Sequence, residues 1–258
     1  MKNFKSIYRI FFYILIAQML INSQFAKATQ ALDWYSEEYP PYNFIDKKDN
    51  RPAGISVDYL IEIFRDLNLD QTRKDIKIMP WSRGYNMAQQ KGLKTVIFAC
   101  TRTQERENLF KWVGPLAPTK ISLFGKKGEK ALGKLPKGDA SVRYAVIRDD
   151  IGQALLLKNG IKPDNLIVTS NIEQMLDLVK IGRVKYIAYE ESVLKYKIKQ
   201  LKSNAPKLDA VHTLKSGELW YAFNKSIDDS VVRDYQKAFD NVLAKKKLVQ
   251  KIKSKYQD

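Results

Sequence analysis

The segment from Thr95 to Cys100 reads Thr-Val-Ile-Phe-Ala-Cys, and it narrows the possible folds more than any other part of the chain. A strand that is exposed on one face alternates apolar and polar residues, whereas a strand covered on both faces reads as a continuous apolar run. Strands of the second kind belong to parallel sheets with helices on both sides. The segment therefore predicts a fully buried strand in an α/β fold.

The residues before this strand alternate between strand and helix patterns. Segments 31–36 and 75–79 have the composition of strands. An apolar stripe at helical spacing runs through 54–67, and a second helix is predicted for 80–90. The order strand, helix, strand, helix, strand indicates a parallel sheet flanked by helices.

A second series of this kind begins at Arg143. Because it repeats the alternation of the first series, it indicates a second α/β unit. Further strands are predicted at 120–124, 144–147, 165–169, 186–189 and 218–224, and further helices at 152–158, 172–181, from 190 onward, 228–245 and 247–256.

The two series predict two lobes, each built on a mostly parallel sheet, joined by two crossover segments near 116–123 and 209–218. The first lobe would comprise 29–118 together with 214–258, and the second lobe 119–213. The C-terminal helices are expected to pack on the first lobe. A cleft between the lobes is the expected place for a ligand.

The first 28 residues have the pattern of a secretory signal peptide. Three basic residues within the first nine positions precede an apolar stretch from Ile10 to Leu20, and Ala26-Lys-Ala28 offers a cleavage site. A membrane anchor is the alternative, but the apolar stretch is short for a span. We expect cleavage near Ala28, a mature chain that begins near Thr29, and a soluble exported protein of the periplasm.

The chain is strongly basic, with a formal net charge of +17. Four of the positive charges lie within residues 1–28, so the rest of the chain carries +13. Such a balance can serve nucleic acid or another anionic surface. The lysines are spread along the chain and no nucleic-acid motif is present, so we favour a lysine-rich solvated surface and expect no nucleic-acid partner.

Few residue types that carry enzyme chemistry are available. The single cysteine, Cys100, ends an apolar strand and is expected to be a small buried hydrophobe. With one His, His212, the chain cannot build a His/Cys metal set, and neither a Gly-rich phosphate loop nor a Gly-x-Ser-x-Gly elbow occurs. We expect no cofactor and no metal. Carboxylate chemistry by Glu37, Glu38 or Glu190 is the only catalysis that the sequence offers.

The turn that follows Cys100 combines three devices that bind anions. Backbone N–H groups at a helix start favour negative charge, and the hydroxyls of Thr101 and Thr103 can donate hydrogen bonds. Arg106 or Arg102 can hold a carboxylate through two parallel bonds. Either arginine could instead form an ion pair with an acidic neighbour, and Thr101 could simply cap the short helix.

Other candidate residues also follow predicted strands. Tyr39 lies in a proline-fixed loop after the first strand, and Trp81 and Arg83 follow the second. In the second lobe, Glu190 ends a strand and could meet an ammonium group, although it could equally cap a helix. The turn at 148–153 could supply N–H groups to the same ligand. An arginine for a carboxylate and a glutamate for an ammonium group form the charge pattern that an amino-acid-like solute requires.

With these residues in view, the chain resembles the family 3 periplasmic solute-binding proteins, the amino-acid-binding type of ABC transporters. The resemblance covers nearly all of the chain after residue 28. The segments that carry it are Glu37-Glu-Tyr-Pro-Pro-Tyr42, Gly54-Ile-Ser-Val-Asp58, Pro80-Trp-Ser-Arg83, Thr101-Arg-Thr-Gln-Glu-Arg-Glu107, Phe110-Lys-Trp-Val-Gly-Pro115, Gly182-Arg-Val184 and Leu219-Trp-Tyr-Ala-Phe-Asn-Lys225.

The resemblance implies a type II periplasmic binding fold, a small-molecule ligand, a membrane ABC permease as partner, and a monomer. By position, the family's carboxylate-binding arginine corresponds to Arg106 and the nearby hydroxyl residue to Thr101. The remaining ligand-binding positions correspond to Tyr39, Trp81, Glu190, Asp150 and Ile151. An exported enzyme similar to the cyclohexadienyl dehydratases and a ligand-sensing module are alternatives on the same fold.

The chain departs from the family pattern at several positions. Gly92-Leu-Lys-Thr95 replaces the usual Gly-Asp-x-Asp, and Asp150 with Ile151 replaces small hydroxyl residues. An acid at this helix start would repel a ligand carboxylate. Trp81, Arg83 and Arg102 resemble a divergent subgroup, so the pattern does not define the ligand.

Overall fold

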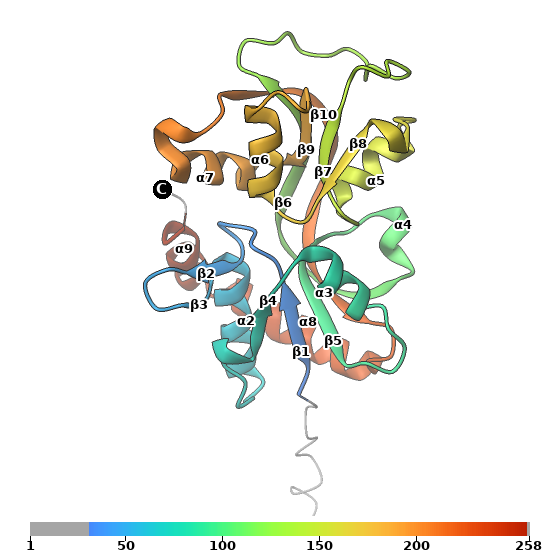
Figure 1. Cartoon of the computed structure of the whole chain (residues 1–258). Coiled ribbons are helices and arrows are strands. Elements are labelled where there is room, and N and C mark those ends of the chain that lie inside the picture. Colours follow the sequence, from blue (N-terminus) through green and yellow to red (C-terminus); the bar gives the residue numbers. More distant parts are fainter. Residues whose placement is uncertain (1–30, 257–258) are drawn as a thin grey trace, which may run out of the picture. The chain divides into compact units, whose positions relative to one another are not determined.

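The computed structural model describes residues 31–256 of the chain, and Figure 1 shows their arrangement. The expected signal peptide lies outside the described residues. The strands are β1 (Asp33–Ser36), β2 (Phe44–Asp46), β3 (Arg51–Ala53), β4 (Ile76–Ile78), β5 (Thr95–Thr101), β6 (Phe110–Lys126), β7 (Tyr144–Ile147), β8 (Leu166–Thr169), β9 (Tyr186–Glu190) and β10 (Leu208–Asn224). The helices are α2 (Ile55–Asp66), α3 (Trp81–Met87), α4 (Gln104–Glu107), α5 (Ile151–Lys158), α6 (Ile172–Lys180), α7 (Glu191–Leu201), α8 (Asp229–Ala244) and α9 (Lys246–Ser254).

The main sheet has eight strands in the order β4-β1-β5-β10-β6-β9-β7-β8. Strand β1 pairs in parallel with β4 and β5, and β7 pairs in parallel with β8 and β9. We call the β4-β1-β5 side the first half of the sheet and the β9-β7-β8 side the second half. Helices flank the sheet (Figure 1), so the predicted α/β class is confirmed.

Two long antiparallel strands, β6 and β10, join the halves of the sheet. Each has 17 residues, and their pairing runs from Leu208 opposite Lys126 to Asn224 opposite Phe110. The segments expected to cross between lobes therefore hydrogen-bond to each other in an antiparallel ladder with three register shifts. Residues 31–258 form one compact unit, and the exact division into lobes stays a prediction.

An aromatic cluster fills the core beside the first half of the sheet. Trp34 of β1 is fully buried and meets Phe64, Tyr221 and Phe223 edge to face, with ring centroids 5.4, 6.0 and 5.7 Å apart. Pairs of this geometry add about 0.5–1.5 kcal/mol each beyond area burial. Helix α8 closes this core through Phe239, which meets Tyr59 and Tyr221 edge to face.

Polar and ionisable residues lie at or just after the carboxyl ends of the parallel strands in both halves. Glu37 follows β1, Thr101 ends β5, Asp150 comes three residues after β7, and Glu190 ends β9. In open α/β sheets, ligands bind beyond the carboxyl ends of parallel strands. Within the described part of the chain, no helix has the length and apolar content needed to cross a membrane.

Candidate ligand-binding site

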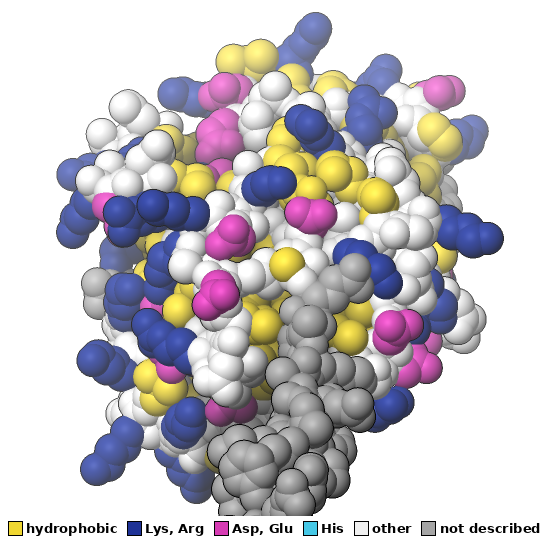
Figure 2. All heavy atoms as spheres, turned by 90° about the horizontal axis from the view of Figure 1, so that it is seen from below, with side chains coloured by type: hydrophobic (Ala, Val, Ile, Leu, Met, Phe, Trp, Pro, Cys, Tyr) yellow, Lys and Arg dark blue, Asp and Glu magenta, His cyan; other side chains and the backbone are white. Residues whose placement is uncertain are grey.

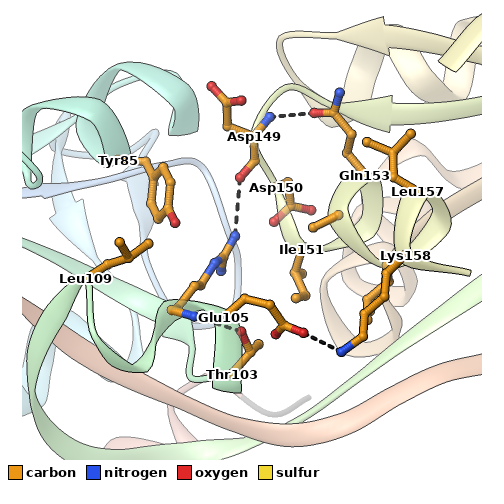
Figure 3. A pocket seen from close by; sticks show the side chains of 13 residues that line it. Tyr85, Thr103, Glu105, Leu109, Asp149, Asp150, Ile151, Gln153, Leu157 and Lys158 are labelled. Carbon is orange, nitrogen blue, oxygen red and sulfur yellow. Dashed lines mark hydrogen bonds and ion pairs between the residues drawn. The ribbon is translucent and has the colours of Figure 1, made fainter.

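A cleft of about 600 Å³ lies between α4 of the first half and α5 of the second half. Figure 3 shows side chains from both halves pointing toward it. The lining residues are Tyr85, Thr103, Glu105, Arg106, Leu109, Asp149, Asp150, Ile151, Gln153, Ala154, Leu155, Leu157 and Lys158. A volume in this range is typical of small-molecule sites.

Arg106 is the buried cation of the cleft, with only 5% of its surface exposed. The Thr103 hydroxyl caps the short helix α4 by accepting a hydrogen bond from the Arg106 N–H at 3.3 Å. Thr103 therefore takes the capping role that the sequence analysis considered for Thr101. The cap fixes the backbone from which the guanidinium reaches into the cleft.

The Arg106 guanidinium has hydrogen-bond partners on both sides of the cleft. Its Nη2 donates to the Asp149 carbonyl at 3.2 Å, and its Nη1 donates to the Thr101 carbonyl at 3.4 Å. The charge also lies 5.5 Å from the Trp81 ring and 4.9 Å from the Tyr85 ring. None of its hydrogen bonds in the described structure goes to a carboxylate, so the charge has no ionic partner at bonding distance.

The acidic neighbours of Arg106 in sequence are engaged elsewhere. Glu105 pairs with Lys158 across the mouth of the cleft. Glu107 accepts two hydrogen bonds from Arg102, at 2.8 and 2.5 Å. The Arg102 guanidinium also lies 4.6 Å from the Trp220 ring. Arg102 is thus held by an ion pair, as one of the two interpretations of the sequence expected, and does not line the cleft.

Two buried carboxyl groups, those of Glu37 and Asp150, lie close to Arg106. Burial and then the charge of Asp150 raise the pKa of Glu37 well above its ordinary value, and Arg106 opposes the shift. Burial also raises the pKa of Asp150, opposed by Arg106 and by the N–H groups of Ile151 and Gly152. The two acids therefore share one cation, which leaves the site with an excess of carboxyl groups.

Glu190 and two tyrosines complete the acidic side of the site. The Glu190 carboxylate caps α7, accepting hydrogen bonds from the N–H groups of Val193 at 2.7 Å and Lys120 at 3.4 Å. Burial raises its pKa. Tyr39 meets Tyr189 edge to face at 5.7 Å. The capping role of Glu190 is realised, and its predicted contact with a ligand ammonium group stays a prediction.

The structure also places the other candidates. The Trp81 indole N–H donates to the Asp149 carbonyl at 2.9 Å, beside Arg106. Thr101 is buried at the end of β5, and Ile151 lines the cleft at the start of α5. Arg83 is exposed, and its side chain forms no hydrogen bond or ion pair among residues 31–256. It lies outside the set that lines the cleft.

Several residues of this region were not assigned to ligand binding from the sequence. Glu37 was considered only for catalysis, although it follows a strand as Thr101 does. Tyr85 lies one turn after Trp81 in α3 and stacks on it at 5.4 Å, so helical spacing could have indicated it. The hydroxyls of Tyr189 and Thr119 are buried without a partner in the described structure. No local sequence signal marks these two.

No group of His, Cys, Asp or Glu side chains suited to a metal ion occurs among residues 31–256. Of the buried groups described above, Arg106 and Asp150 line the cleft, whereas Glu37, Glu190, Tyr39 and Trp81 are buried but do not line it. Such a set can bind a small polar solute through charge pairing and ring contacts.

The fold and the cleft between its halves are those of a solute-binding protein. A family model, "Bacterial extracellular solute-binding proteins, family 3", matches residues 34–258, and the chain belongs to this family. The expected family is thereby confirmed. The chain has no significant match among curated protein sequences.

Solved structures of the same fold agree with this assignment. A histidine kinase sensor domain with similarity to periplasmic binding proteins is 18% identical, covers 88% of this chain and 96% of its own, and has a TM-score of 0.75. The arginine-, lysine-, histidine-binding protein ArtJ of Geobacillus stearothermophilus is 17% identical, with coverage of 88% and 95% and a TM-score of 0.72. An ancestral arginine-binding protein bound to arginine is 20% identical, with coverage of 88% and 98% and a TM-score of 0.70. The predicted periplasmic binding fold is confirmed.

Proposed function

We propose that this chain is an exported binding protein that captures a small polar solute between two lobes for uptake by an ABC permease. The solute is an amino acid or a related carboxylate that also carries a cationic group. The observation that supports this most directly is the buried charge of Arg106, which has only carbonyl, thiol and ring partners. A buried cation of this kind is stabilised strongly by a carboxylate in bidentate geometry.

The acidic groups support a ligand with a second, positive charge. Asp150 would repel a simple carboxylate, as the sequence analysis noted. In the proposed site it acts with Glu37, because a ligand cation between the two carboxyl groups would favour their ionised forms. Glu190 is the third acid on this side, held in place by its bonds to α7. Structural relatives described as binding arginine, lysine or histidine are consistent with such a solute.

Lobe closure is the proposed mechanism. The two halves of the sheet are linked by β6 and β10, and bending of these strands would open the cleft. In the described structure Trp81, Arg106 and Lys158 each form a contact that crosses it. We expect Tyr39 and Trp81 to form the aromatic wall against which the ligand packs, with Thr101 and Ile151 at its edges.

A thermal-shift screen of the chain beginning at Thr29 tests the proposal. The probes are amino acids, polyamines, short peptides and organic acids, because a ligand that binds only the folded state raises Tm by mass action. We expect cationic amino acids to raise Tm more than neutral ones. A screen in which only uncharged or purely anionic compounds raise Tm would reject the proposed ligand class.

Acid catalysis is a second candidate function, and the raised pKa of Glu37 favours it. A carboxyl group whose pKa is raised by burial can act as a general acid. The family and the structural relatives are mostly binding proteins, so we place this second. Incubation with prephenate or arogenate distinguishes the enzyme from the binding protein, because only the enzyme releases an aromatic product.

The sensor domain among the relatives supports a third role, that of a ligand-sensing module, which would require a separate signalling partner.

A further inference from the structure

Two adjoining grooves at the end of the second half far from the cleft are lined by cationic side chains. Seven lysines and arginines line the two grooves, with one carboxylate, that of Glu129. The cations are Lys126, Lys127, Lys180, Lys207, Arg143, Arg183 and Lys185. We call them the distal cationic ring. They come from the end of α6, the end of β6 and the turn after it, and the turns before β7, β9 and β10, at the top of Figure 1.

Few members of the distal cationic ring form an ion pair within the described residues. Among the described residues, Lys185 is the only member with an ion pair, which it forms with Glu129 at 3.2 Å. Asp209, the nearest acid on β10, accepts a hydrogen bond from the Gly128 N–H instead. Figure 2 views the opposite end of the molecule, where Asp and Glu side chains are interspersed among the lysines. That end of the molecule thus carries charges of both signs.

An exposed isoleucine lies within the ring. Ile181 has 69% of its surface exposed, more than any other large hydrophobic residue that the structure describes. Its chain neighbours are members of both grooves, because Lys180 lines one, and Gly182 and Arg183 line the other. Ile181 therefore offers an exposed apolar side chain next to the two cationic grooves.

We propose that the distal cationic ring docks the protein on an anionic phospholipid surface, with Ile181 inserted among the headgroups. Basic residues near such a surface each add to its attraction for the protein, and an apolar side chain adds a term that salt does not screen. The exposed Ile181 favours a lipid surface over a soluble polyanion, which offers no apolar layer. The export proposed above would bring the protein to phospholipid surfaces.

Docking at this end leaves the ligand cleft free. Lys185 precedes β9 and Glu190 ends it, so the five residues of the strand separate the two sites by about 17 Å. The ligand and the lipid surface would therefore bind at the same time. The choice of a lipid surface rests on the proposed export, but the interaction does not require solute binding, and its test needs no ligand.

Vesicle cosedimentation of the chain beginning at Thr29 tests the proposal, since this chain retains the whole compact unit. Vesicles of phosphatidylcholine alone are compared with vesicles in which phosphatidylglycerol replaces part of it. The distal triple variant, Lys127→Ser, Lys180→Ser and Lys207→Ser, removes three exposed charges. The matched control, Lys246→Ser, Lys247→Ser and Lys253→Ser, removes three exposed charges from α9.

We expect the wild type to bind only the vesicles with phosphatidylglycerol. The distal triple variant should lower the partition coefficient by about 100-fold, and the control triple by less than about tenfold. Ile181→Ser should weaken the binding that persists at high salt, and Ile181→Leu should preserve it. Equal losses in the two triple variants would overturn the proposal, because they would indicate diffuse attraction by net charge. No binding by the wild type, or no effect of Ile181→Ser, would overturn it as well.

Discussion

Gly152 offers the sharpest test of how the cleft is built. It lies in the first turn of α5, directly after Asp150 and Ile151. A Cβ at this position would lie 2.5 Å from the carbonyl oxygen and 3.2 Å from the carbonyl carbon of Ala188. Ala188 belongs to β9, and its backbone is fixed on one side by β6 and on the other by β7. Because the new Cβ would clash with backbone atoms, rotation of a side chain cannot relieve the clash.

The magnitude of the effect follows from this geometry. Overpacking of a well-packed site costs about 1–3 kcal/mol. The better helix propensity of alanine returns less than about 1 kcal/mol, and less still in a first turn. We therefore expect Gly152→Ala to lower the free energy of unfolding by about 2 kcal/mol, in the middle of the range for overpacking. For a chain of this length, that lowers Tm by about 4–8 °C.

Urea unfolding followed by tryptophan fluorescence measures this change. Gly133→Ala is the matched control, because a Cβ at Gly133 would meet nothing within 4 Å and its φ is not in the left-handed region. The control should be neutral or slightly stabilising. In addition, Gly152→Ala should weaken ligand binding, since α5 must move away from β9 and carry Asp150 with it. A Gly152→Ala variant as stable as the control would refute the reasoning about this contact.

Two further predictions concern the charges of the cleft. Arg106→Ala should lower the affinity for the best ligand of the thermal-shift screen by about 10- to 150-fold in calorimetry, the value of a charged hydrogen bond. Arg102→Ala should leave this affinity unchanged, and equal losses in both variants would contradict the assignment. Because folding raises the pKa of Glu37, that carboxyl contributes stability below about pH 4.5, its ordinary value, and loses it as pH rises through the raised value. Glu37→Gln should therefore match the wild type in acid and exceed its stability near neutral pH, and parallel stability–pH curves from urea unfolding would contradict this.

The sequence predicts the fold well where periodicity and burial agree. The apolar run at Thr95–Cys100 and the stripe through 54–67 became β5 and α2 because both elements are buried as their patterns require. The short strands β2 and β3 were missed, since three residues in each are too few to show a period. The full lengths of β6 and β10 were missed as well. Their outer parts pair with each other and need no local strand signal.

The site was predictable in position but less so in contacts. Arg106 was singled out because an arginine after a buried strand lies where ligands bind, and the structure places it in the cleft. Arg102 differs from it by four residues, a spacing that puts both on one helix face only if both are helical. It precedes α4, and its side chain turns instead to Glu107 and Trp220. The choice of partner depends on tertiary neighbours that no local pattern encodes.

The Asp149 carbonyl explains how ligand binding and closure can be coupled in the proposed mechanism. It accepts hydrogen bonds from the Trp81 indole and from Arg106, so two donors of the first half converge on one acceptor of the second half. Asp149 has a φ of 59°, a conformation that places strain in the chain just before α5. A ligand carboxylate would offer Arg106 charge-assisted bonds about twice as strong as those of a neutral carbonyl. The exchange of carbonyl for carboxylate therefore favours ligands that bring their own anion, and it changes one of the contacts that cross the cleft. A ligand with only cationic groups would satisfy Glu37 and Asp150 but leave that contact in place.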